Sequence, residues 1–294
     1  MAWISLRLGR APARGLLRLI AAYFLVCSPP ARRAIADWLR RVRGADAPPV
    51  GWRDLFRSFL CFASVVHDRV FLVNDQFSLF DVSLHGAQVI ADLRAEGRGV
   101  FLIGAHMGSF EMLRALGGRQ PGQRIAMAMY KDNAQKINEL LGAINPRAAL
   151  DIVALGQVDS MVQLHRLLEA GGIVGMLGDR LLGDDVIRTI DFFGAPAAFP
   201  TGPFRMAAIA RCPVVFMVGL YRGGNRYEVH LEQLADFSTA SAGGRQAAVE
   251  EAMDRYAHLL EKYGRLAPDN WFNFHDFWQE HEAPAAKSRR GGAA

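Results

Sequence analysis

The sequence has few cysteines and lacks the short motifs of nucleotide, metal and serine-hydrolase sites. Its three cysteines are odd in number and far apart, which fits a reducing compartment without a disulfide framework. No G-x-G-x-x-G or GKS/T loop follows a predicted strand, so a nucleotide or dinucleotide enzyme is not expected. Neither H-E-x-x-H nor paired cysteines occur, so we expect no metal and no cofactor. G-x-S-x-G is also missing, which argues against a serine hydrolase.

Acidic residues are almost missing from residues 1–43, which hold nine arginines and one acid, Asp37. The same segment is apolar, but its run over 15–29 is interrupted by arginine and shorter than the roughly 20 residues of a confident membrane span. No cleavage site of a secretory signal follows it. We predict a membrane-associated helix on an anionic, cytoplasm-facing surface, because arginines stay on the non-translocated side. Packing on the protein's own core is the alternative.

The whole chain, with 294 residues of which 51% are hydrophobic, is long enough to bury a full core. A Gly/Pro-rich break at 44–51 is followed by an amphipathic helix pattern over 52–72 and then by alternating helices and strands. The predicted strands are 100–104, 124–130, 151–155, 173–177, 213–220 and 226–231. The predicted helices are 85–96, 132–143, 158–170, 202–211 and 244–264. We predict one α/β domain over 52–283, with a largely parallel central sheet flanked by helices, and a disordered tail over 284–294.

Residues 100–111 combine a buried strand, a sharp turn and the start of a helix. The apolar run 100–103 ends at a glycine, and a helical pattern begins near Ser109. His106 lies between them, at the carboxyl end of a strand, where open α/β sheets place their sites. A neutral imidazole can take a proton from a hydroxyl, and the Glu111 carboxylate can fix its tautomer. We predict a His106–Glu111 dyad; the alternative is a capping histidine and a first-turn carboxylate.

Two other strand ends carry charged residues. Asp179 and Arg180 follow the predicted strand 173–177, so we expect them at the same edge of the sheet as His106. Lys131 follows the strand 124–130 and suits a phosphate or a polarised carbonyl.

The segment 189–203 is predicted to be an apolar surface loop leading into a helix capped by Thr201. A surface loop so rich in phenylalanine and alanine needs a cover. An acyl chain or the bilayer would provide one, and a neighbouring helix of the same protein is the alternative.

Four segments together resemble the lysophospholipid acyltransferase superfamily and, within it, the bacterial lipid A late acyltransferases of the lauroyl/myristoyl group. HMGSFE at 106–111 matches the HxxxxD/E motif. GDR at 178–180 and DFFGAPAAFPTG at 191–202 resemble an Asp-containing strand end and an FFG-x-PA...TG block. PDNWFNFH at 268–275 is similar to a P-x-x-W/Y-x-W-x-H stretch, and the basic N-terminus to a membrane anchor. The resemblance covers residues 3–280.

The resemblance implies that His106 is the base on the acceptor hydroxyl and Glu111 its orienting partner. It assigns substrate contacts to residues in the remaining motifs: Lys131, Asp179, Arg180, Phe193, Gly194, Thr201 and Gly202. The implied partners are an acyl-carrier-protein or coenzyme A thioester as donor, a lipid or glycolipid acceptor, and an anionic membrane, with no nucleic acid. The implied location is the cytoplasmic face of the bacterial inner membrane.

Lys131 stands where the group usually has arginine, and lysine cannot form a bidentate clamp. Acceptors other than the lipid A disaccharide, as in pigment and ornithine-lipid pathways, therefore stay open. Two other classes of function also stay open. One is a thioesterase or hydrolase that uses the same pair on water. The other is a non-catalytic adaptor that binds membrane or nucleic acid through the N-terminal arginines.

Overall fold

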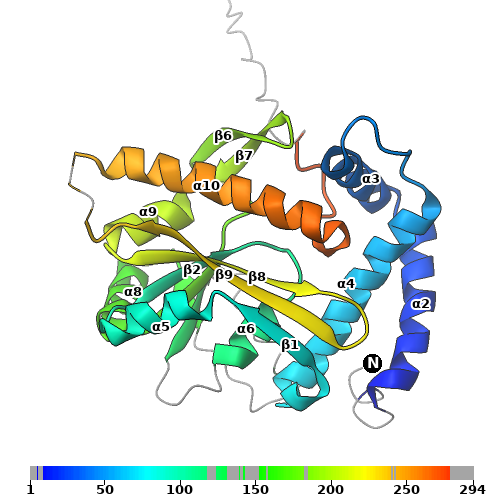
Figure 1. Ribbon diagram of the computed structural model, residues 1–294, viewed down its shortest axis with the longest axis horizontal. Coiled ribbons are helices and arrows are strands. Elements are labelled where there is room, and N and C mark those ends of the chain that lie inside the picture. The colour runs from blue at the N-terminus through cyan, green and yellow to red at the C-terminus, as the bar shows by residue number, and fades with distance from the viewer. Residues whose placement is uncertain are drawn as a thin grey trace, which may run out of the picture.

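The structure is a computed structural model that describes residues 5, 9–117, 124–130, 139, 142, 152–156, 158–181, 185–239, 241 and 243–278 (Figure 1). The predicted tail over 284–294 and nearly all of the predicted helix over 132–143 lie outside these ranges.

The described residues form a seven-stranded sheet in the order β1-β9-β8-β2-β5-β3-β4. The strands are β1 (Asp81–His85), β2 (Val100–Gly104), β3 (Ile125–Tyr130), β4 (Ile152–Leu155), β5 (Ile173–Leu177), β8 (Pro213–Tyr221) and β9 (Arg226–Asp236). All neighbouring strands run parallel except β8 and β9, which are antiparallel. The predicted α/β class with a largely parallel sheet is confirmed. The polar edge strand β1 was not predicted.

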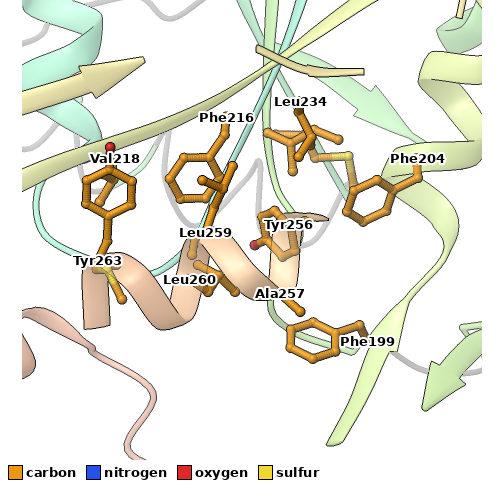
Figure 2. Close-up of a cluster of buried hydrophobic side chains, with 14 of the residues drawn as sticks. Phe199, Phe204, Phe216, Val218, Leu234, Tyr256, Ala257, Leu259, Leu260 and Tyr263 are labelled. Carbon is orange, nitrogen blue, oxygen red and sulfur yellow. The ribbon is translucent and has the colours of Figure 1, made fainter. Parts of the chain in front are cut away.

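Helices cover both faces of this sheet (Figure 1). They are α4 (Trp52–Val73), α5 (Ala87–Ala95), α6 (Phe110–Gly117), α8 (Val158–Glu169), α9 (Gly202–Ile209) and α10 (Arg245–Leu266), with short 3₁₀ turns η1 (Phe77–Leu79) and η2 (Pro268–Asn270). Alternate residues of a strand point to opposite faces. Accordingly, Phe216 of β8 packs on Tyr256 of α10 (Figure 2), whereas its neighbour Met217 joins the cluster of Leu93 from α5 and Phe110 from α6. With both faces covered, β8 is a nearly continuous apolar run.

The segment 189–203 is not a loop, so that prediction is wrong. It forms most of a hairpin of β6 (Ile187–Phe192) and β7 (Ala195–Pro200), followed by the start of α9. Phe193 and Gly194 make the two-residue turn with φ angles of 53° and 75°, the positive values that such hairpins require. Phe192 and Phe199 are fully buried, the first against Trp38 and the second against Tyr256. The protein itself covers these side chains.

The N-terminal segment contains two helices, α2 (Arg10–Cys27) and α3 (Pro29–Arg43). Prolines 29 and 30 fit the first turn of α3, where a backbone N–H has no helical partner. One face of α2, with Leu17 and Ala21, is buried and packs on α4, whereas Leu19 and Val26 are 67% and 68% exposed. Within the described residues, no helix has the length and apolar character needed to cross a membrane.

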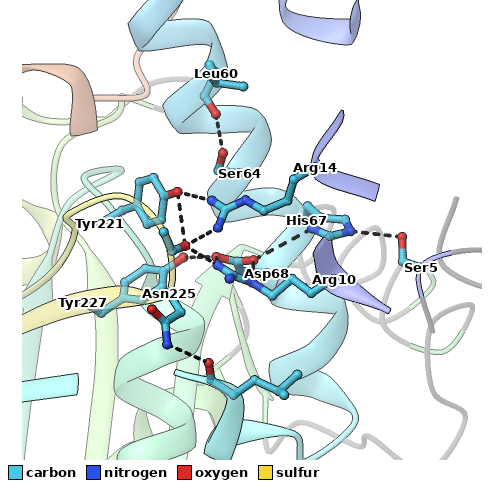
Figure 3. A network of polar contacts seen from close by, with 12 residues as sticks. Ser5, Arg10, Arg14, Leu60, Ser64, His67, Asp68, Tyr221, Asn225 and Tyr227 are labelled. Atoms are coloured by element: carbon cyan, nitrogen blue, oxygen red, sulfur yellow. Dashed lines mark hydrogen bonds and ion pairs between the residues drawn. The ribbon is translucent and has the colours of Figure 1, made fainter. Parts of the chain in front are cut away.

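A buried ionic network fastens α2 to the body of the protein (Figure 3). Two guanidinium nitrogens of Arg10 donate to the Asp68 carboxylate, each at 2.7 Å, and the Tyr227 hydroxyl donates to it at 2.9 Å. Arg14 also donates to the Gly224 carbonyl and the Tyr221 hydroxyl. The network therefore joins α2 to α4 and to the β8–β9 turn.

Candidate functional site

The loop after β2 is fixed by close contact with two other segments. Its Gly108 has a φ of 66°, and a Cβ there would lie 2.0 Å from the carbonyl oxygen of Gly219, so only glycine fits. The Ser109 N–H donates to the same carbonyl at 2.7 Å, and Met107 forms a bridge with Trp271. Helix α6 then begins at Phe110. His106 therefore precedes the helix on a rigid turn, as the sequence predicted.

His106 is paired with Asp179, which follows the neighbouring strand β5. Nδ1 of His106 lies 2.8 Å from Oδ1 of Asp179, and the backbone N–H of His106 donates to Oδ2 at 2.9 Å. Because β2 and β5 are adjacent and parallel, both residues emerge at the same edge of the sheet. An ionised carboxylate only accepts hydrogen bonds, so it places the imidazole proton on Nδ1 and leaves Nε2 as the basic nitrogen. The His106 side chain is 30% exposed, so substrate can reach it.

The Asp179 carboxylate is fully buried and remains ionised because of its partners. Burial alone would raise its pKa, but the charge of His106, the hydrogen bonds from His106 and the charge of Arg180 hold that pKa below its usual range. A further hydrogen bond comes from Nδ2 of Asn273 at 2.8 Å. The buried charge is therefore well satisfied, and it can stabilise an imidazolium on His106.

Arg180 and the segment after η2 close the site. The Arg180 guanidinium donates from Nε to Oδ1 of Asn273 at 2.6 Å and from Nη2 to the Phe272 carbonyl at 3.0 Å. Burial lowers the pKa of Arg180, while the charge of Asp179 opposes that shift. The Phe272 N–H donates to the His106 carbonyl at 2.8 Å, so this segment also holds the turn that carries His106.

Glu111 lies in a different ionic environment from the one predicted. It occupies the first turn of α6 and is 4% exposed, but its Oε2 accepts from Nε of Arg114 at 2.8 Å. Its Oε1 lies 3.9 Å from Nε of Arg69, on α4. Asp179, not Glu111, is the carboxylate at Nδ1 of His106. The physical reason is register: the parallel β5 brings its own strand end beside His106, whereas Glu111 lies beneath α4.

The remaining predicted residues lie in three places. Lys131 is outside the described residues. Phe193 and Gly194 form the tip of the β6–β7 hairpin, with the Phe193 ring 5.2 Å from that of Trp38. Thr201 occupies the N-cap position of α9 without a side-chain capping bond, and Gly202 begins that helix. The structure thus brings together His106, Asp179 and Arg180 from the predicted set.

Asn273 was not predicted as a site residue. It is 2% exposed and bridges Asp179 and Arg180. The only sequence signal near it was the resemblance of residues 268–275 to a motif, which does not say which side chain points inward.

Two cavities adjoin the N-terminal helices. The first, of about 500 Å³, has a largely apolar lining from α2, α3, α4 and Phe274. Phe24, Phe62 and Val66 line it and are each more than one-third exposed, so it opens at an apolar surface. The second, of about 620 Å³, lies between α3 and His275 and includes Arg33 and Arg40.

These features define an α/β protein with a His–Asp pair suited to deprotonating a hydroxyl or a water molecule. Among the described residues, no cluster of three or more metal-ligating side chains occurs. Residues 66–280 match the family of bacterial lipid A biosynthesis acyltransferases, and the chain belongs to that family. A search of curated proteins finds no match. Family membership indicates an acyltransferase with an acyl donor and a lipid acceptor.

Proposed function

We propose that this protein is a membrane-associated O-acyltransferase. It moves a fatty acyl group from an acyl-carrier-protein or coenzyme A thioester to a hydroxyl of a lipid or glycolipid, at the cytoplasmic face of the bacterial inner membrane. The observation that carries the proposal is the hydrogen-bonded pair of His106 and Asp179 at the carboxyl edge of the sheet.

The pair supports direct attack by the acceptor on the thioester. Nε2 of His106 takes the acceptor's hydroxyl proton as that oxygen bonds to the thioester carbonyl carbon. The buried Asp179 carboxylate stabilises the imidazolium that forms. When the carbon–sulfur bond breaks, the imidazolium returns the proton to the departing thiolate. The products are an ester and a free thiol, and the neutral histidine is regenerated.

In this proposal Asp179 takes the orienting role that the sequence gave to Glu111. Glu111 instead serves as the counter-ion of Arg69 and Arg114, which ties α6 to α4. Arg180 stays with the site, where it adds positive charge beside the reacting carbonyl.

The exposed face of α2 is proposed to lie on the membrane. Its large apolar side chains on this face are Leu16, Leu19, Tyr23, Phe24 and Val26. Exposed arginines accompany them on α2 and α3, which suits anionic headgroups. The 500 Å³ apolar cavity opens beside this face and offers space for hydrocarbon.

The reaction is tested by product analysis with purified protein in anionic vesicles. A radiolabelled acyl thioester is supplied with and without extracts of lipid acceptors. We expect label to move into a lipid ester only when acceptor is present. Release of free fatty acid at the same rate without acceptor would instead support the thioesterase alternative. Salt-sensitive binding to RNA, without binding to vesicles, would support the adaptor alternative.

The membrane face is tested with the double variant Leu19→Asp/Val26→Asp. We expect it to lose most sedimentation with anionic vesicles, because two charges replace side chains that are 67% and 68% exposed. Ile209→Asp is the matched control, since Ile209 is 59% exposed on α9, away from α2. Equal binding by all three proteins would place the membrane contact elsewhere.

A further inference from the structure

We propose that Asn273 is a positioning residue, which fixes the Asp179 carboxylate and through it the ring of His106. The inference rests on the proposed role of the His106–Asp179 pair and extends it to a residue 94 positions from Asp179 in the sequence. The observation that supports it is that the buried amide of Asn273 hydrogen-bonds to both Asp179 and Arg180.

The chemistry of its two neighbours allows the Asn273 amide only one orientation. Its nitrogen lies 2.8 Å from Oδ2 of Asp179, and its oxygen lies 2.6 Å from Nε of Arg180. A carboxylate can only accept and a guanidinium can only donate, so a flipped amide would lose both bonds. At 2% exposure, water cannot replace them. The Asn273 amide is thus held in one orientation by the charged side chains of Asp179 and Arg180.

This amide completes the set of donors that fixes the carboxylate plane. Oδ1 of Asp179 contacts Nδ1 of His106, and Oδ2 receives the His106 backbone N–H and Nδ2 of Asn273. Among the described residues, the other hydrogen bonds to the Asp179 carboxylate come from His106, the residue that this carboxylate would orient. The bond from Asn273 therefore fixes the His106–Asp179 pair relative to another segment of the chain.

The backbone around Asn273 is tied to the same turn. The Phe272 N–H donates to the His106 carbonyl, and the Gly108 N–H donates to the Asn270 carbonyl, both at 2.8 Å. Both contacts hold the segment just before Asn273 against the turn that carries His106. A side chain held this firmly can position its partner, as a second layer does around a functional group.

Among the described residues, the groups that interact electrostatically with Asp179 include His106, Arg180 and Tyr256, and they set the sign of the expected effect. His106 and Arg180 lower the pKa of Asp179, while Tyr256 of α10 hydrogen-bonds to the Gly104 carbonyl and is neutral. In Asn273→Asp, a carboxylate replaces the donor and adds like charge beside Asp179. We expect the pKa of Asp179 to rise by about one unit or more. Asn273→Ser shortens the side chain, so that its donor no longer reaches Asp179, and adds no charge; we expect it to raise the pKa of Asp179 by a smaller amount.

The experiment follows the Asp179 carboxyl carbon by ¹³C NMR as a function of pH, together with kcat, KM and the pH–rate profile. We expect both variants to lower kcat by about 10- to 100-fold with little change in KM. The acid limb of the profile should move to higher pH in Asn273→Asp. Asn270→Ala is the matched control, because Asn270 is equally buried but binds the backbone of Tyr221.

An unmoved Asp179 titration in both Asn273 variants, with only thermal stability reduced, would show that Asn273 merely supports the fold. An equal shift in Asn270→Ala would assign the effect to the segment and overturn the role of the amide. If Asn273→Asp does not fold by circular dichroism, Asn273→Ser decides the question. Absence of acyl transfer by the wild type would defeat the proposed function, and the NMR titration would still test Asn273.

Discussion

Replacing His106 with alanine is expected to lower acyl transfer by about 10²- to 10⁴-fold, the usual contribution of a general base. The loss should appear in kcat, because in the proposed mechanism Nε2 acts on the acceptor hydroxyl only as the new ester bond forms. The side chain is 30% exposed and its backbone bonds do not depend on the ring, so folding and vesicle binding should persist. Initial rates, circular dichroism and vesicle sedimentation measure these three properties.

Two carboxylate variants decide which partner His106 uses. Asp179→Asn should cause a loss similar to that of His106→Ala, because it removes the charge at Nδ1. Glu111→Gln should retain most of kcat and lose stability, because the Glu111 oxygens face Arg114 and Arg69. The reverse ranking would restore the His106–Glu111 dyad that the sequence predicted. Full transfer by His106→Ala would eliminate general-base catalysis at this position altogether.

The central strands were predictable because burial on both faces leaves a simple pattern. Strands β2 and β5 begin and end at the predicted residues, since each is a continuous apolar run bounded by glycine. Strand β1 lacks that pattern, because four of its five residues are exposed at the edge of the sheet. The β6–β7 hairpin was missed for another reason. Its turn uses a phenylalanine at positive φ instead of the Asn-Gly or Asp-Gly pair that signals such turns.

Only those parts of the candidate site that follow from the order of the strands in the sheet were predictable. Strand ends of adjacent parallel strands meet at one edge, so His106 and Asp179 were expected close together. Which carboxylate reaches Nδ1 depends on side-chain direction, and Glu111 points to α4. Asn273 depends on a segment from the far end of the chain returning beside β2. No local pattern specifies that contact.

Removing the Asp68 carboxylate is expected to be among the most destabilising single changes in this protein. Asp68→Ala leaves the Arg10 guanidinium, 14% exposed, without its bidentate partner, and leaves the Tyr227 hydroxyl without an acceptor. Breaking a buried ion pair in this way costs about 3–5 kcal/mol. Urea denaturation followed by circular dichroism would measure the change in the free energy of unfolding.

The pH dependence of the free energy of unfolding tests the contribution of Asp68 in a second way. Burial alone would raise the pKa of Asp68, but His67, Arg10 and Tyr227 hold it below its ordinary value of 3.8. A depressed pKa in the folded state means that this stability is complete above the unfolded pKa and disappears as pH falls through the folded one. Wild type should therefore lose more stability than Asp68→Ala when the pH is lowered below 3.8.

A more exposed ion pair on α3 provides the control for the loss of stability expected in Asp68→Ala. Asp37 is 28% exposed and contacts Arg40 and Arg41 within its own helix, so Asp37→Ala should cost less than about 1 kcal/mol. If Asp68→Ala is no more costly than Asp37→Ala, the network does not fasten α2.

Faster proteolysis near Cys27, at the end of α2, should accompany the loss of stability in Asp68→Ala, because α2 then detaches from α4. Unchanged cleavage with a large loss of stability would instead locate the cost in the core between α4 and β9.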